Sequence, residues 1–249
     1  MNTHKCFSLF LATALAALCA RAGTSTEDLA QQVTIRRTAY GVPHILAENE
    51  RAAGFGMGFA QAEDHGLNIM RSVLRARGEQ AKWFGTKKDI EEDFRNRQFR
   101  VYARAVETYH LLDADWREMI EGFAQGFNYW VELNRSELSV WFGPINGHDV
   151  AAHGLAGVMR FAFDRSGIVG KFIKKLEGGE EAVVEPEAEG SNMWAFAPRK
   201  TKSSKAILMG NPHQPWSPVA TYYEAHVTIP GKYNVYGTTF VGRPVITAG

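Results

Sequence analysis

Ser191 and His213 are the residues whose types and spacing are best suited to nucleophilic chemistry. A β-hairpin that pairs Ala197 with Ala206 places position 191 opposite position 212, so His213 lies beside Ser191 at the open end of the hairpin. A serine hydroxyl next to a histidine is a candidate nucleophile. The spacing alone is weak support, because serine and histidine often come together by chance.

Other common catalytic motifs are absent from the sequence. It contains no Gly-x-Ser-x-Gly turn, which argues against an α/β-hydrolase. It contains neither His-Glu-x-x-His nor Cys-x-x-Cys, which argues against a motif-based zinc site. Gly54, Gly56 and Gly58 do not have the spacing of a dinucleotide-binding loop. The Ser191–His213 pair therefore remains the leading catalytic candidate.

The composition is that of an ordinary globular protein. The chain has 249 residues, 45% of them hydrophobic and 22% charged, with a formal net charge of +1. These values exclude a disordered chain, a collagen-like repeat and a disulfide-dense miniature protein. The balanced charge also argues against a nucleic-acid partner. The length fits one large domain or two small ones.

Residues 1–22 have the features of a signal peptide. Lys5 precedes an apolar stretch over 7–20, and Ala20 and Ala22 stand at the two positions that signal peptidase reads. Cleavage after Ala22 would remove the only two cysteines and change the net charge to 26 − 27 = −1. We therefore expect a periplasmic or secreted protein. The alternative is a buried N-terminal helix, and no later apolar run is long enough to span a membrane.

The first part of the chain is predicted to be mainly helical. It opens with a strand at 33–37, which continues through a turn over 40–45. Residues 51–77 have a helical pattern, and their early glycines indicate close packing against another backbone. A second amphipathic helix carries apolar side chains at helical spacing, which is typical of a core: Trp116, Met119, Ile120, Phe123, Phe127, Trp130 and Val131. Another helix is predicted over about 150–164.

An acidic segment separates this helical region from a β-rich one. Residues 177–189 contain six glutamates and no lysine or arginine, and Gly178, Gly179 and Pro186 interrupt regular structure, so we interpret the segment as a solvated linker. Strands are then predicted over 192–197, 206–210, 222–228 and 233–240. The sequence therefore predicts an α+β protein.

Several segments, in order, resemble the penicillin amidase (penicillin acylase) family of N-terminal nucleophile hydrolases. Residues 190–194, Gly-Ser-Asn-Met-Trp, resemble the family's processing junction. Residues 37–45 resemble its opening strand, and 58–64 its first helix. Residues 211–216 and 228–231 are similar to the branch of acyl-homoserine lactone acylases and aculeacin-type acylases, with His213 where penicillin G acylases tend to carry glutamine.

The resemblance implies a fold and a chain organisation. The expected fold is part of the αββα sandwich of the N-terminal nucleophile hydrolases. It implies an α-chain region over 23–176, a spacer peptide over 177–190, and a β-chain that starts at Ser191 and covers 191–249. The β-chain remainder would be the partner of the α-chain in an α/β heterodimer.

The resemblance also implies a mechanism. The precursor would cut itself between Gly190 and Ser191, and the Ser191 hydroxyl would then attack an amide carbonyl. The freed α-amine would serve as the general base, since its pKa of about 7.7–8.0 suits proton transfer near neutral pH. His213 would orient these groups. Asn192 is as well explained by strand geometry as by a role in the site.

The substrate implied by the resemblance is a small N-acyl compound, such as an acyl-homoserine lactone or an acylated lipopeptide. Met159, Phe163 and Gln214 are the expected substrate-binding residues, although Met159 and Phe163, at helical spacing, are equally well explained as core residues. A β-lactam side-chain acylase is the alternative enzyme, and an inactive remnant is the alternative outside enzymes. No cofactor is expected, and the sequence does not support a calcium site.

The resemblance further implies that the family's β-chain extends several hundred residues beyond the nucleophile. The groups that relatives use to stabilise the oxyanion would lie beyond Gly249, and each such donor is worth about 3–4 kcal/mol. We therefore expect residues 23–249 alone to be inactive. We also expect residues 222–240 to form an exposed apolar edge.

Overall fold

The computed structural model of the protein describes residues 26–161, 190–214 and 216–249. The predicted signal peptide, the acidic linker over 177–189 and Phe163 lie outside the described residues. Among the described residues, no helix is both long enough and apolar enough to cross a membrane.

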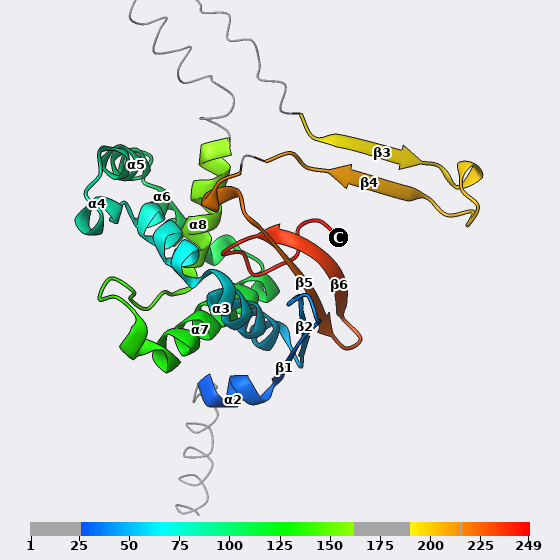
Figure 1. Ribbon diagram of the computed structural model, residues 1–249, viewed down its shortest axis with the longest axis horizontal. Coiled ribbons are helices and arrows are strands. Elements are labelled where there is room, and N and C mark those ends of the chain that lie inside the picture. The colour runs from blue at the N-terminus through cyan, green and yellow to red at the C-terminus, as the bar shows by residue number, and fades with distance from the viewer. Residues whose placement is uncertain (1–25, 162–189, 215) are drawn as a thin grey trace, which may run out of the picture.

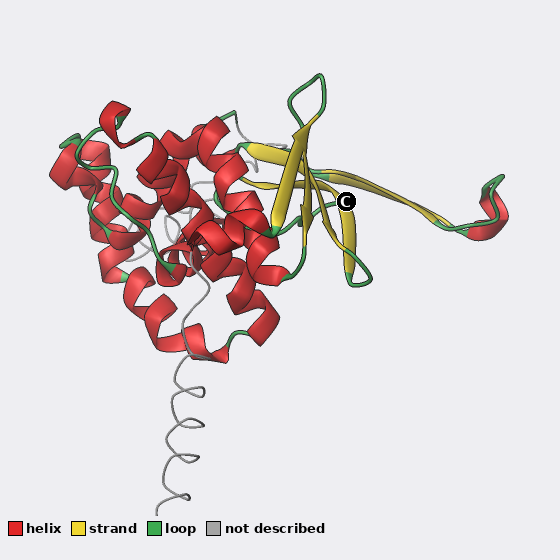
Figure 2. Cartoon of the chain, turned by 90° about the horizontal axis from the view of Figure 1, so that it is seen from below, coloured by secondary structure: helices red, strands yellow, loops and turns green. Residues whose placement is uncertain are grey.

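Helices and strands occupy separate parts of the molecule (Figures 1 and 2). The helices are α2 (Thr26–Gln31), α3 (Glu50–Arg77), α4 (Gln80–Trp83), α5 (Lys87–Gln98), α6 (Val101–Thr108), α7 (Ala114–Leu133) and α8 (Gly147–Arg160). The strands are β1 (Val33–Arg37), β2 (Pro43–Ala47), β3 (Asn192–Phe196), β4 (Ile207–Asn211), β5 (Tyr222–Ile229) and β6 (Tyr233–Phe240). This mixed arrangement agrees with the predicted α+β class, whereas the two-sheet sandwich stays a prediction.

One sheet joins the two ends of the described chain. Its strand order is β1-β2-β5-β6, and only the β2–β5 pair is parallel. The expectation that 222–240 form an exposed edge is wrong for β5, because β2 pairs with it on one side and β6 on the other. Within 222–240, β6 alone is an edge strand, and there the backbone N–H of Thr238 donates to the carbonyl of Ala248 at 2.7 Å. Strands from before and after the acidic linker thus form a single sheet.

Glycines let α3 and α7 touch backbone to backbone. A Cβ built on Gly54 would lie 2.1 Å from the carbonyl oxygen of Met119, and one on Gly58 would lie 2.1 Å from that of Phe123. Gly122 and Gly126 on α7 meet the backbone of α3 in the same way. Larger residues cannot occupy such positions without a shift of the backbone. The close backbone approach predicted for this helix is therefore confirmed.

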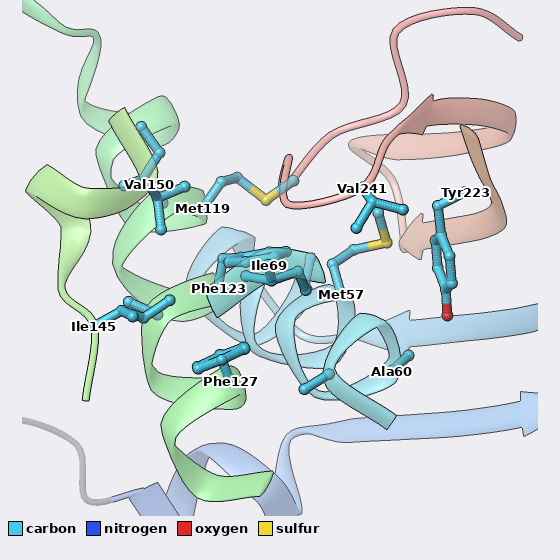
Figure 3. Packing of buried hydrophobic residues seen from close by; sticks show 14 of the residues in the cluster. Met57, Ala60, Ile69, Met119, Phe123, Phe127, Ile145, Val150, Tyr223 and Val241 are labelled. Atoms are coloured by element: carbon cyan, nitrogen blue, oxygen red, sulfur yellow. The ribbon is translucent and has the colours of Figure 1, made fainter. Parts of the chain in front are cut away.

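The core lies between this helix pair and one face of the sheet. Phe123 and Phe127 from α7 pack with Met57 and Ile69 from α3, and Tyr223 and Val241 close the cluster from the strand side (Figure 3). Buried and exposed residues alternate along β5, as expected for a strand that packs on helices with one face only. The predicted apolar face of the helix over 116–131 is therefore core from Met119 to Val131, whereas Trp116 at its start is exposed.

A buried ion pair fixes the start of α8. The Asp149 side chain is fully buried and accepts hydrogen bonds from Arg77 Nε at 2.6 Å and Nη2 at 2.7 Å. Asp149 also completes a capping box with Asn146, so the helix begins at Gly147 rather than at about 150. The predicted end at 164 lies outside the described residues. The ion pair therefore helps to position α8, which carries Met159, one of the expected substrate-binding residues.

Candidate active site

The β3–β4 hairpin has the register that the sequence predicts. Its pairs run from Asn192–Asn211 to Phe196–Ile207, and the antiparallel pairing brings the two ends of the hairpin together. Every residue of both strands is exposed, including the large apolar side chains of Met193 and Leu208. The hairpin extends away from the sheet and the helices (Figure 1).

Ser191 and His213 are in contact at the open end of this hairpin. The backbone N–H of His213 donates to Ser191 Oγ at 3.2 Å. The contact therefore uses the main chain of His213 and leaves its imidazole free to interact elsewhere. Because the N–H occupies a lone pair of Oγ, it fixes the position of the hydroxyl without removing its proton.

Two asparagines surround the imidazole of His213. The side-chain amide nitrogens of Asn192 and Asn211 each lie 3.2 Å from His213 Nε2. An amide N–H₂ group can only donate, so in this arrangement Nε2 accepts and the ring N–H is on Nδ1. The two amides therefore hold the imidazole in one orientation and one tautomer.

Asn211 is the residue that sequence reasoning missed. The predicted register already placed Asn211 opposite Asn192, so a signal was present in the sequence. The sequence favours neither a structural nor a catalytic role for Asn192, and the structure places its amide nitrogen 3.2 Å from His213 Nε2. The described site is thus a group of four side chains around one hairpin end: Ser191, Asn192, Asn211 and His213.

The expected substrate-binding residues are not brought together. Met159 lines a cavity of about 80 Å³ whose wall also includes Arg75, Arg160 and His153. Gln214 lines a different, open groove beside Asn68 on α3. Phe163 lies outside the described residues. The structure therefore places Met159 and Gln214 in two separate cavities, and the acyl pocket stays a prediction.

The cavity next to Met159 is polar as well as apolar. Desolvation lowers the pKa of His153 to about 4, outweighing the hydrogen bond from its Nε2 to the carbonyl of Val241 at 3.0 Å. Desolvation also lowers the pKa of Arg75 below its ordinary value. His153 is therefore neutral at physiological pH. A wall that includes three arginines, Arg75, Arg95 and Arg160, is poorly suited to a purely aliphatic chain.

The described residues contain no cluster of three or more metal-binding side chains. Within 26–161, 190–214 and 216–249, no such group of histidine, cysteine, aspartate or glutamate side chains could hold a metal ion.

Sequence comparison agrees with the order of the motifs along the chain. Residues 32–249 match the sequence profile of the family described as penicillin amidase. The chain belongs to the penicillin amidase family.

Two named relatives are similar to this family member over most of its length. It is 32% identical to the acyl-homoserine lactone acylase PvdQ of Pseudomonas fluorescens (strain Pf0-1), a match that covers 86% of this chain and 31% of the relative. It is 28% identical to the aculeacin-A acylase of Actinoplanes utahensis, over 98% of this chain and 35% of the relative. The chain thus spans about a third of the length of the curated relatives it matches.

A solved structure is also similar to this chain. It is the thermostable penicillin G acylase from Alcaligenes faecalis in a tetragonal form, with a TM-score of 0.47 and 22% sequence identity. The match covers 60% of this chain and 85% of that chain.

Proposed function

We propose that this member of the penicillin amidase family is an acylase precursor that cuts itself between Gly190 and Ser191. It then hydrolyses the amide bond of small N-acyl compounds. The observation that carries the proposal is the hydrogen bond from the His213 backbone to Ser191 Oγ, at the residue where the processing motif begins. The names of the relatives support acyl-amide chemistry.

The first step is the attack of Ser191 Oγ on the carbonyl carbon of Gly190. The C–O bond forms as the C–N bond to Ser191 breaks, which leaves an ester and a free α-amine, and water then hydrolyses the ester. Gly190 is exposed, and no atom lies within 4 Å of a Cβ built there, so the residue before the scissile bond is uncrowded. This exposure favours cleavage without a separate protease.

Turnover repeats the same chemistry on a substrate. The new α-amine of Ser191 accepts the hydroxyl proton as Oγ attacks the acyl carbonyl, and this proton passes to the departing amine. Water then hydrolyses the acyl ester and restores the hydroxyl. His213, whose ring is oriented by Asn192 and Asn211, acts as a positioning residue for Ser191 rather than as the base.

The two chains produced by cleavage would stay together as an α/β heterodimer. β2 precedes the cleavage site and β5 follows it, and they pair in parallel through His44–His226, Ile45–Val227 and Leu46–Thr228. Tyr223, Ala225 and Val227 also belong to the same core as Met57 and Phe123. A periplasmic or secreted location is proposed from the signal-peptide features of residues 1–22.

An assay with matched substrates tests the substrate class. We expect the protein expressed from its own gene to release free amine faster from short-chain or long-chain acyl-homoserine lactones than from penicillin G. The amine released is measured with a fluorogenic amine reagent, at equal substrate concentrations.

Faster turnover of penicillin G would assign the protein to β-lactam side chains and overturn the proposed substrate class. Release of no amine from any of these compounds by protein already cleaved at Ser191 would favour the inactive remnant.

A further inference from the structure

His44 and His226 form a second cluster that the proposed catalysis does not use. They are direct partners on β2 and β5. On β2, His44 alternates with the buried Pro43 and Ile45, so the two imidazoles lie on the sheet face away from the helical core. Their ring centroids are 4.9 Å apart at 84°, and their Nδ1 atoms are 2.9 Å apart.

The surroundings of His226 fix which of its nitrogens carries the proton. His226 Nε2 lies 2.7 Å from Asn234 Oδ1, and Thr228 Oγ1 donates to the same oxygen at 3.2 Å. A carbonyl oxygen can only accept, so Nε2 carries a proton and the lone pair of Nδ1 is directed at His44. Metal-binding histidines commonly have their second nitrogen fixed by such a hydrogen bond.

We propose that His44 and His226 bind a divalent copper or nickel ion through their Nδ1 atoms. In the metal-free protein, the proton on His44 Nδ1 joins the two nitrogens. On binding, this proton moves through solvent to His44 Nε2, which keeps the imidazole neutral, and the ion bonds to the lone pairs of both Nδ1 atoms. The ion stays divalent throughout, so the step needs no oxidant or reductant.

The distance between the nitrogens favours a particular coordination geometry. Two metal–nitrogen bonds of about 2.0–2.1 Å at a right angle place their nitrogens about 2.9 Å apart. A tetrahedral angle requires about 3.4 Å, which is the arrangement that zinc prefers. The observed 2.9 Å therefore fits a tetragonal ion such as Cu²⁺ or Ni²⁺, and Cu²⁺ is the tighter binder at nitrogen sites.

Side chains from β1, β5 and β6 surround the two imidazoles. The Tyr236 ring on β6 stacks on His44 and meets the edge of His226, with centroid distances of 6.5 and 6.1 Å. Glu224 on β5 contacts the Tyr236 hydroxyl and adds negative charge, whereas Arg36 on β1, the direct partner of His44, adds positive charge. With two protein ligands, water would complete the coordination, so the ion would exchange readily.

The two histidines lie on opposite sides of the proposed cleavage site in the sequence. His44 precedes Gly190–Ser191 and His226 follows it, so an ion bound by both would link the two chains of the processed protein. This consequence rests on the proposed self-cleavage, whereas the metal site itself does not.

Copper binding to the histidine variants tests the site. We expect the protein, purified without a histidine tag, to bind one Cu²⁺ that His44→Asn or His226→Asn abolishes, measured by calorimetry at neutral pH. Electron paramagnetic resonance of the bound Cu²⁺ should show two imidazole nitrogens. Asn234→Leu, which removes the acceptor shared by His226 Nε2 and Thr228 Oγ1 but neither ligand, should weaken binding about tenfold. His110→Asn, at an exposed position, should leave binding unchanged.

Thermal unfolding in EDTA checks that each variant is folded, so a folding defect is not mistaken for loss of a ligand. Equal Cu²⁺ affinity in the wild-type protein and folded His226→Asn would overturn the proposal. Absence of Cu²⁺ binding to the wild-type protein would also overturn it, and would leave a histidine pair that shares only a proton. Neither result depends on whether the chain cleaves itself.

Discussion

Replacing Ser191 by alanine should leave a single uncut chain and lower acyl-amide hydrolysis by about 10⁴-fold or more, because the variant has no hydroxyl to attack either carbonyl. The hydrogen bond from the His213 backbone places Oγ of Ser191 at the open end of the hairpin, directly after Gly190. Mass spectrometry of the purified protein measures the cleavage, and amine release measures the hydrolysis.

Ser203→Ala is the matched control for this change. Ser203 is an exposed serine in the turn of the same hairpin, so its loss should affect neither cleavage nor hydrolysis. Ser191→Cys should still cut, since a thiol is also a nucleophile. Two chains in purified Ser191→Ala would show that another agent cuts the protein, and the self-cleavage proposal would then fail.

Replacing Gly58 by alanine should destabilise the protein by about 3 kcal/mol. The new Cβ would lie 2.1 Å from the carbonyl oxygen of Phe123, and this neighbour is backbone that cannot rotate away. α3 and α7 must therefore separate, at the upper end of the usual cost of overpacking. Urea unfolding followed by circular dichroism measures the loss.

Gly154→Ala provides the control, because it places the same substitution in α8, where nothing lies within 4 Å of the added Cβ. There alanine should be neutral or should stabilise the protein by up to about 1 kcal/mol, since glycine is a poor helix former. If Gly58→Ala unfolds at the same urea concentration as Gly154→Ala, the backbone contact between α3 and α7 does not carry the stability assigned to it.

Local features of this fold could be predicted from the sequence. The turn between Ala197 and Ala206 sets the register of its own hairpin, so the contact between Ser191 and His213 followed from counting residues. The early glycines of α3 likewise indicated a close backbone approach. In both cases the information lies within a short stretch of chain.

Long-range features could not be predicted in this way. The parallel pairing of β2 with β5 joins His44 to His226 across the whole acidic linker, and no local pattern sets that register. The wrong expectation of an exposed edge at β5 followed from this gap. The resemblance implies that Met159 and Gln214 line one pocket, but they line two different cavities. Which side chains meet there depends on the packing of α3, α8 and the strands, which no local sequence pattern specifies.

The most direct test of the account is to find which atom carries the acyl group during turnover. The purified protein is mixed with an activated ester of a long-chain fatty acid, quenched in acid within seconds, and digested for tandem mass spectrometry. We predict an acyl ester on Oγ of Ser191, in a peptide that begins with Ser191 and has a free α-amine. An acyl group on another residue, or turnover by a chain in which the Gly190–Ser191 bond is intact, would contradict the account.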